Sequence, residues 1–145
     1  MTTFRFRLQR VLEYRQTQLE LEEVTLRQQA AALAELDRGR AGLEAAGVQA
    51  ERQVRQGAEL DGADLAALAA FRASLRRRAQ ELAARRAECA GLIAQQRGAV
   101  TEARRRCRLL ERMRERRLAE WNAAYDRELE TTAAESYLAQ WARRL

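Results

Sequence analysis

A seven-residue repeat of apolar side chains is the feature of this sequence that most restricts its fold. Four leucines near the start follow at this interval: Leu12, Leu19, Leu26 and Leu33. Later in the chain two heptad positions are occupied by Leu68, Leu75, Leu82, Cys89, Ala103 and Leu110, and by Ile93, Val100, Cys107 and Trp121. Such repeats turn one side of an α-helix towards a partner helix and predict a left-handed coiled coil.

Composition agrees with this prediction. The 145 residues include no proline and seven glycines, and Ala, Leu, Glu, Gln and Arg dominate. These five residue types form helices readily, whereas β-branched and aromatic strand formers are scarce. We therefore predict an all-α chain, folded as one domain over residues 1–145.

One break near the middle divides the helical pattern. The stretch GAELDGADL, residues 57–65, carries two glycines and three acidic residues, of which Asp61 favours a turn and Asp64 can cap a helix. We expect a first helix over about 4–56, a loop over about 57–64 and a second helix over about 65–142.

Folding the chain about residue 61 makes an antiparallel two-helix coiled-coil hairpin. Facing residues then have numbers that add to about 122, so Leu12 meets Leu110 and Val54 meets Leu68. The pairing matches apolar positions along both helices, which favours this hairpin over a parallel dimer. Because the first helix ends opposite about residue 118, the second is expected to continue as a C-terminal helical overhang.

The stretch FRFRLQRVLEYR, residues 4–15, allows two periods. Phe4, Phe6 and Leu8 alternate with arginines, as in a strand, but Phe4, Leu8 and Leu12 also follow helical spacing. We interpret the alternation as a coincidence of composition and expect a helix from Phe4, capped by Thr3.

The apolar seam is interrupted by polar residues, which cost stability and can define the register. They are Arg15, Glu22, Gln29 and Arg40 in the first helix, and Arg86, Gln96 and Arg114 in the second.

Two aromatic stripes lie on the expected overhang. The first is Trp121, Tyr125 and Leu129, and the second is Tyr137, Leu138, Trp141 and Leu145. Exposed aromatic stripes typically mark a protein contact. Local fold-back and dimerisation through the same stripe are the alternatives.

The basic residues are all arginine and give a net charge of +6. Eight of them form a basic collar: Arg104, Arg105, Arg106, Arg108, Arg112, Arg114, Arg116 and Arg117. The hairpin pairing would bring Arg5, Arg7 and Arg10 beside it. A solvated basic face, an acidic protein partner and nucleic acid are three interpretations, although apolar seam residues run through the collar, unlike the basic region of a zipper protein.

Catalysis finds little support, since the chain has no histidine and no glycine-rich phosphate loop. We expect no enzymatic activity, no cofactor and no metal site. Cys89 and Cys107 would lie about 27 Å apart on one helix, too far for a disulfide. Because no apolar run is long enough to span a membrane and no signal peptide is evident, we expect a cytoplasmic protein.

The opening residues also carry a family resemblance. The chain begins with Phe-x-Phe-x-Leu and a Val-Leu-x-x-Arg step, formed by Phe4, Phe6, Leu8, Val11, Leu12 and Arg15. Near the end of the long heptad region, residues 109–121 read LLERMRERRLAEW. In this order and length the chain resembles the flagellar export protein FliJ family.

This resemblance implies a non-enzymatic central stalk of the type III protein-export apparatus. Such a stalk inserts into a hexameric export ATPase and activates it, links it to a membrane export gate, and escorts export chaperones. The implied ATPase-docking residues are Phe4, Phe6, Leu8, Leu12, Arg15, Trp121 and Tyr125. Phe71 and Leu75 would face the gate.

The implied location is the cytoplasm, at the periphery of the inner membrane, and we expect a monomer when the chain is alone. Two alternatives stay open: the equivalent stalk of a virulence-type III secretion system, and a basic coiled-coil scaffold or nucleic-acid-binding protein.

Overall fold

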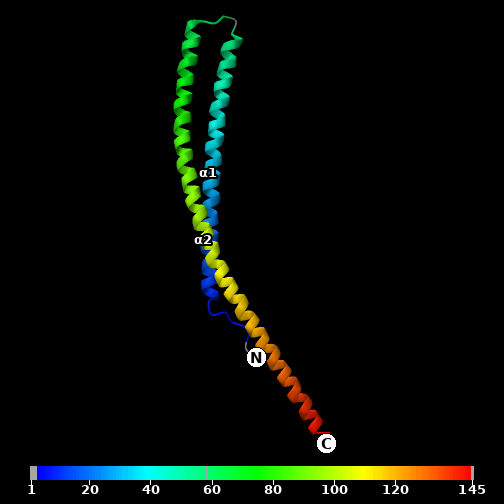
Figure 1. The fold of residues 1–145 in the computed structure, drawn as a ribbon. Helices are drawn as coiled ribbons and strands as arrows, with labels where there is room; N and C mark the ends of the chain where they lie inside the picture. Colours follow the sequence, from blue (N-terminus) through cyan, green and yellow to red (C-terminus); the bar gives the residue numbers. More distant parts are fainter. Residues whose placement is uncertain (1–2, 58, 145) are drawn as a thin grey trace. The chain divides into compact units, whose positions relative to one another are not determined.

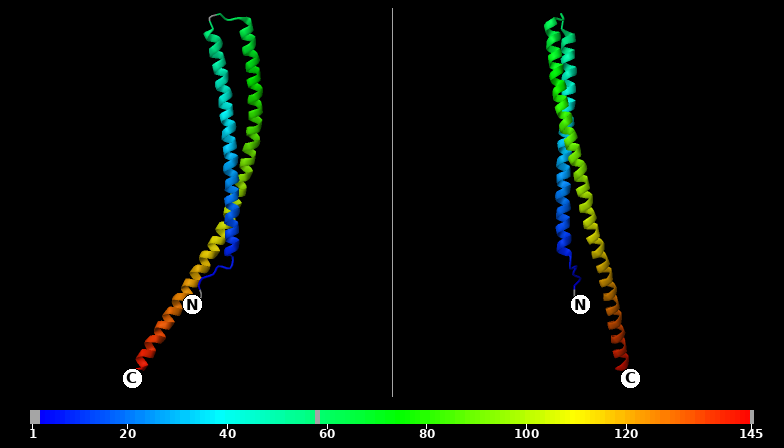
Figure 2. Two further views of the ribbon diagram at one scale, coloured as in Figure 1. Left: turned by 180° about the vertical axis from the view of Figure 1, so that it is seen from behind. Right: turned by 60° about the vertical axis from the view of Figure 1, so that its left-hand side comes forward.

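Two long helices make up most of the protein in a computed structural model, which describes residues 3–57 and 59–144. Helix α1 spans Gln9–Gln56 and α2 spans Gly62–Ala142. Their facing segments run antiparallel (Figure 1), and the two further views in Figure 2 agree. No strand occurs within the described ranges. The predicted all-α antiparallel hairpin is confirmed.

The chain divides into two compact units. The hairpin unit is Leu21–Val100, and the terminal unit combines Met1–Glu20 with Thr101–Leu145. Each unit therefore contains one segment of α1 and one of α2. That the whole chain forms one domain stays a prediction.

The hairpin unit is held together at the predicted heptad positions. Ile93 and Val100, seven residues apart, are its buried apolar side chains among the residues described. Two glycines of α1 admit leucines from α2: Leu75 Cδ1 lies 3.4 Å from where a Cβ on Gly47 would stand, and Leu82 Cδ1 lies 3.6 Å from the equivalent point on Gly39. The residue numbers in these two contacts add to 122 and 121, within one residue of the predicted register.

The start of α2 differs from the prediction. The helix begins at Gly62, three residues earlier than expected, because Asp61 and not Asp64 occupies its N-cap position. The Leu65 amide donates to the Asp61 carbonyl at 3.2 Å, which is the first helical hydrogen bond. Asp64 lies in the first turn, where a carboxylate interacts favourably with the helix dipole.

The start of α1 also differs. The helix begins at Gln9, and residues 3–6 have no regular secondary structure. The Leu12 amide donates to the Leu8 carbonyl at 2.9 Å, so the helical hydrogen bonds start at Leu8 and Thr3 does not cap them. The prediction of a helix from Phe4 was therefore wrong by one and a half turns.

A search of the described helices for a membrane-spanning stretch found none that combines the required length and apolarity.

Candidate protein-docking site

An aromatic ladder joins the first residues of the terminal unit to α2. The Phe4 ring lies 6.2 Å from the Trp121 ring, centroid to centroid, at an interplanar angle of 59°. Trp121 in turn stacks on Tyr125 at 5.2 Å and 22°. Trp121 and Tyr125 meet because they are one helical turn apart. All three rings are half-buried, so part of each remains accessible to a partner.

The alternation in FRFR is a structural feature, which corrects the interpretation of it as coincidence. Phe4, Phe6 and Leu8 are half-buried, whereas Thr3, Arg5 and Arg7 are exposed. Residues 3–6 are not helical, so their side chains do not follow the 3.6-residue period and alternate ones can lie against a neighbour. Packing of Phe4 on Trp121 outweighs the helical spacing because an isolated first turn of helix gains few hydrogen bonds.

Two other predicted docking residues, Leu12 and Arg15, have different environments in the terminal unit. Leu12 is 4% exposed and belongs to the core of the terminal unit, so it supports the site and offers little surface to a partner. Arg15 is half-buried, and its guanidinium carbon lies 5.7 Å from the centre of the Tyr14 ring.

Cys107 packs in the same core and is 3% exposed. Burial, together with the nearby carboxylate of Glu111, raises the pKa of its thiol above the ordinary value, and the guanidinium of Arg15 offsets part of that rise. The neutral thiol therefore predominates at neutral pH, and Cys107 acts as a small apolar side chain. Both cysteines are free.

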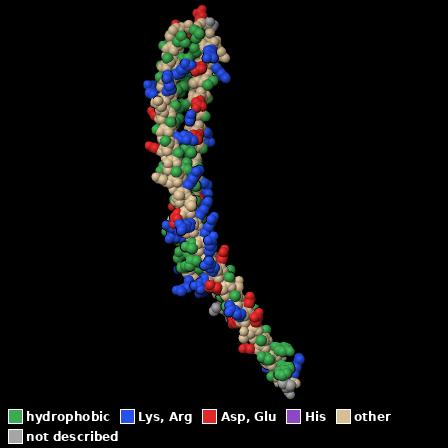
Figure 3. Space-filling model, viewed as in Figure 1, with side chains coloured by type: hydrophobic (Ala, Val, Ile, Leu, Met, Phe, Trp, Pro, Cys, Tyr) green, Lys and Arg blue, Asp and Glu red, His purple; other side chains and the backbone are tan. Residues whose placement is uncertain are grey.

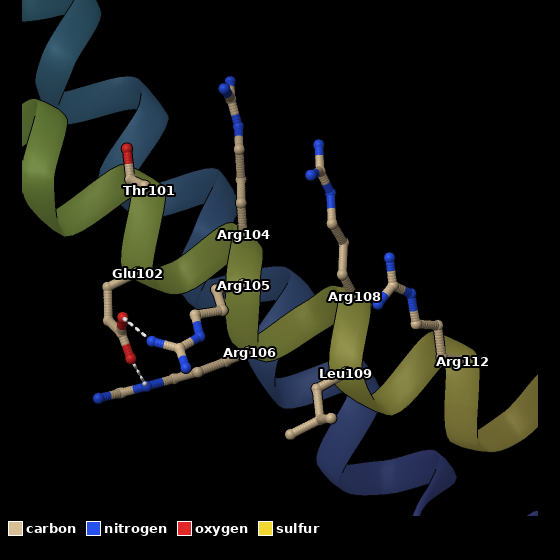
Figure 4. A pocket seen from close by; sticks show the side chains of 8 residues that line it. All are labelled: Thr101, Glu102, Arg104, Arg105, Arg106, Arg108, Leu109 and Arg112. Atoms are coloured by element: carbon tan, nitrogen blue, oxygen red, sulfur yellow. Dashed lines mark hydrogen bonds and ion pairs between the residues drawn. The ribbon is translucent and has the colours of Figure 1, made fainter.

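Some arginines of the basic collar pair with a carboxylate on α2, and others project from the helix (Figure 4). Arg105 and Arg106 turn towards Glu102, with nitrogen–oxygen distances of 4.0 Å and 3.2 Å. Arg108 and Arg112 project together from the helix, in the same direction as Arg104. Further along, Arg117 pairs with Glu120 at 3.0 Å. The collar thus offers a row of guanidinium groups one helical turn apart.

The N-terminal arginines lie beside this collar, as the hairpin pairing predicted. Arg114 lines a shallow hollow together with Phe4 and Phe6, and the other lining residues include Arg5, Arg7 and Arg10. Because four guanidinium groups surround two half-buried aromatic rings, this part of the terminal unit suits a partner with acidic and apolar groups close together.

The two residues expected to face a membrane gate lie in the hairpin unit and have different environments. Phe71 is 39% exposed and lines a hollow with Val54 and Leu68. Leu75 is half-buried and packs towards Gly47, so it is part of the contact between the helices. Phe71 alone of the pair presents a large surface.

Sequence reasoning missed two features. One is the pairing of polar seam positions with each other: the Gln96 side-chain amide donates to the Glu22 carbonyl at 3.0 Å and also to its carboxylate. Both residues had been singled out as polar seam positions, but the predicted register sets Gln96 opposite Leu26, so it did not indicate this pair. The other is an acidic stretch, residues 120–135, which carries five acidic residues and one arginine.

Metal binding has no candidate site among the described residues, where no cluster of three or more His, Cys, Asp or Glu side chains occurs.

Comparison with known proteins gives no match: no family model, no curated protein and no solved structure is similar to this chain.

Proposed function

We propose that the protein is a non-enzymatic central stalk of the flagellar type III protein-export apparatus, which docks through its terminal unit into a hexameric export ATPase and activates it. The aromatic ladder is the observation that carries this proposal. Phe4 belongs to the motif on which the resemblance to the FliJ family rests, and it packs directly on Trp121. Half-buried rings surrounded by arginines are the composition that protein interfaces favour.

The proposal assigns a role to each part of the terminal unit. The ladder supplies apolar anchors, and the collar attracts acidic groups on the ATPase. Leu12, in the core of the terminal unit, stabilises the packing of its helical segments. The hairpin unit carries Phe71, the one gate-facing candidate with a large exposed surface. Location at the cytoplasmic side of the inner membrane and escort of export chaperones belong to the same proposal.

Activation of the ATPase provides the test. Mixing the purified chain with the export ATPase of the same organism should increase ATP hydrolysis and the yield of hexamers. Changing Phe4 and Trp121 together to alanine should weaken binding by roughly thirtyfold or more, the effect of losing a central aromatic anchor. The matched control is Tyr14→Ala, which removes an aromatic ring that is 57% exposed and outside the ladder.

Two results would count against the proposal. These are an unchanged rate of hydrolysis on adding the wild-type chain, and equal losses of binding in the ladder variant and the Tyr14 variant. Far-UV circular dichroism checks that each variant retains its helicity, so that a loss of binding reports on the ladder. The gene neighbourhood distinguishes a flagellar stalk from its virulence-type equivalent.

Nucleic-acid binding is a second candidate, supported by the row of Arg104, Arg108 and Arg112 along one side of α2 (Figure 4). It predicts binding to DNA or RNA that weakens steeply as salt is raised. It also predicts that nucleic acid displaces the export ATPase. Retention of ATPase activation in excess nucleic acid would contradict it.

A further inference from the structure

The side of α2 that faces away from the seam has a charge pattern complementary to itself. Spacings of four and three residues place one set of exposed side chains on a single stripe. The members of this outer stripe, in order, are Arg112, Arg116, Ala119, Ala123, Asp126 and Glu130. Ala119 and Ala123 each lie two residues from Trp121, about 200° around the helix, so the outer stripe is separate from the aromatic ladder.

The order of residues in the stripe is basic, small, acidic. Residues 104–117 contain eight arginines and two acidic residues, whereas residues 120–135 contain five acidic residues and one arginine. Figure 3 shows arginine side chains followed by acidic ones along this part of α2. Among the described residues, Arg112, Arg116, Asp126 and Glu130 form no ion pair.

We propose that two copies of the chain associate through the outer stripe, antiparallel and related by a two-fold axis between Ala119 and Ala123. In this register Arg112 of each copy lies opposite the second copy's Glu130. Arg116 likewise lies opposite Asp126, and each pair occurs twice by symmetry. The two alanines at the centre let the helix backbones approach closely, as small residues do at helix contacts.

The same register also covers apolar surface. Tyr137 and Trp141 continue the outer stripe and are 70% and 57% exposed. The pairing sets Tyr137 opposite Arg105 of the second copy, where a guanidinium can stack on the ring. The exposed Tyr137 ring thus gains a neighbour in the dimer.

A second copy fits the stripe better than other occupants. Nucleic acid would be attracted by the arginines but repelled by Asp126 and Glu130. An acidic protein would leave the same two carboxylates unpaired. Only a partner that is acidic opposite the arginines and basic opposite the carboxylates satisfies both halves, and an antiparallel copy of the stripe has that order.

The association is expected to be weak and dependent on salt, since exposed ion pairs contribute little individually and are screened. It replaces the expectation of a monomer. The inference does not depend on the proposed function, because the dimer leaves Phe4 and Trp121 uncovered and is measured without an ATPase.

Sedimentation equilibrium of the full chain at low salt tests the proposal. Across roughly a hundredfold range of concentration, the mean mass should rise from monomer towards dimer, and added salt should reverse the rise. Glu130→Arg and Arg112→Glu should each weaken dimerisation about tenfold or more, because each places like charges opposite one another. The double variant, with both charges exchanged, should restore it to within about threefold of the wild type.

Glu135→Arg is the matched control, since it makes the same change of charge at an exposed residue outside the stripe. It should weaken dimerisation by less than about threefold. A wild-type chain that stays monomeric throughout would overturn the proposal, with retention on an anionic polymer column then favouring a nucleic acid. Equal effects of Glu130→Arg and Glu135→Arg, or no recovery in the double variant, would overturn it as well.

Discussion

The polar contacts that cross between α1 and α2 in the hairpin unit include the following four. The Gln96 amide donates to Glu22, and the Arg86 Nε donates to Asp37 Oδ1 at 2.7 Å. Arg72 pairs with Glu51. In the fourth, the Cys89 thiol donates to the Gln29 carbonyl at 3.5 Å. Because each contact joins particular residues of the two helices, together they disfavour a shifted register.

Gln29 is the weak point of this set. Its side-chain oxygen is buried and accepts no hydrogen bond from any described residue. We predict that Gln29→Leu raises the free energy of unfolding by about 1 to 2 kcal/mol, because it removes an unpaired polar atom and adds apolar surface to the seam.

Urea denaturation followed by circular dichroism measures this change. The matched control is Gln28→Leu, the same substitution at the neighbouring exposed position, which should alter stability by less than about 0.5 kcal/mol. A Gln29 variant less stable than the wild type would show that the oxygen has a partner in solution.

At the scale of the helix, α2 carries glycines that its packing does not require. A Cβ added to Gly91 or Gly98 would meet no atom within 4 Å, and neither residue has a positive φ. Glycine in a helix interior costs about 1 kcal/mol relative to alanine. The two positions therefore lower the stability of α2 without a steric reason.

We predict that Gly91→Ala stabilises the protein by about 1 kcal/mol, measured by urea denaturation. Gly47→Ala is the informative comparison, because its new methyl group would contact Leu75 Cδ1 at 3.4 Å. Because Leu75 would have to shift, Gly47→Ala should raise the free energy of unfolding by less than Gly91→Ala does. If Gly47→Ala instead stabilised the protein more than Gly91→Ala, the two helices would have room to adjust at Gly47.

At the scale of the whole molecule, burial is distributed unevenly. Among the residues that the structure describes, the buried apolar side chains are Leu12, Ile93, Val100 and Cys107. From residue 126 to residue 144, every described residue is exposed. Helical hydrogen bonds without tertiary packing open readily, since propensity alone stabilises a helix only marginally.

We therefore predict that amides of residues 126–142 exchange with solvent at least roughly a hundredfold faster than those near Ile93 and Val100. Hydrogen exchange with mass spectrometry, at a concentration low enough to keep the chain monomeric, measures this difference. Equal protection in both segments would contradict the prediction. At high concentration the C-terminal segment should gain protection if the outer stripe dimerises.

Much of the fold could be predicted from the sequence because its signals are local and repeated. Among the described residues, all of the buried apolar side chains, Leu12, Ile93, Val100 and Cys107, occupy predicted heptad positions. The same periodicity predicted a register that agrees with the position of Leu75 against Gly47. For the candidate site, the pattern of aromatic residues pointed to Trp121 and Tyr125, which are neighbours on one helix and needed no tertiary information.

What the sequence alone determined is therefore the helices, their order and their register near the loop, since these follow from propensity and from a period repeated over many turns. Only the tertiary structure decided the path of Phe4 and Phe6. The sequence there fits both helical and alternating spacing, and the contact of Phe4 with Trp121 favours the non-helical path. It also decided that Gln96 pairs with Glu22, 74 residues away. A hydrogen bond of that range depends on how two helices meet, which no local pattern specifies.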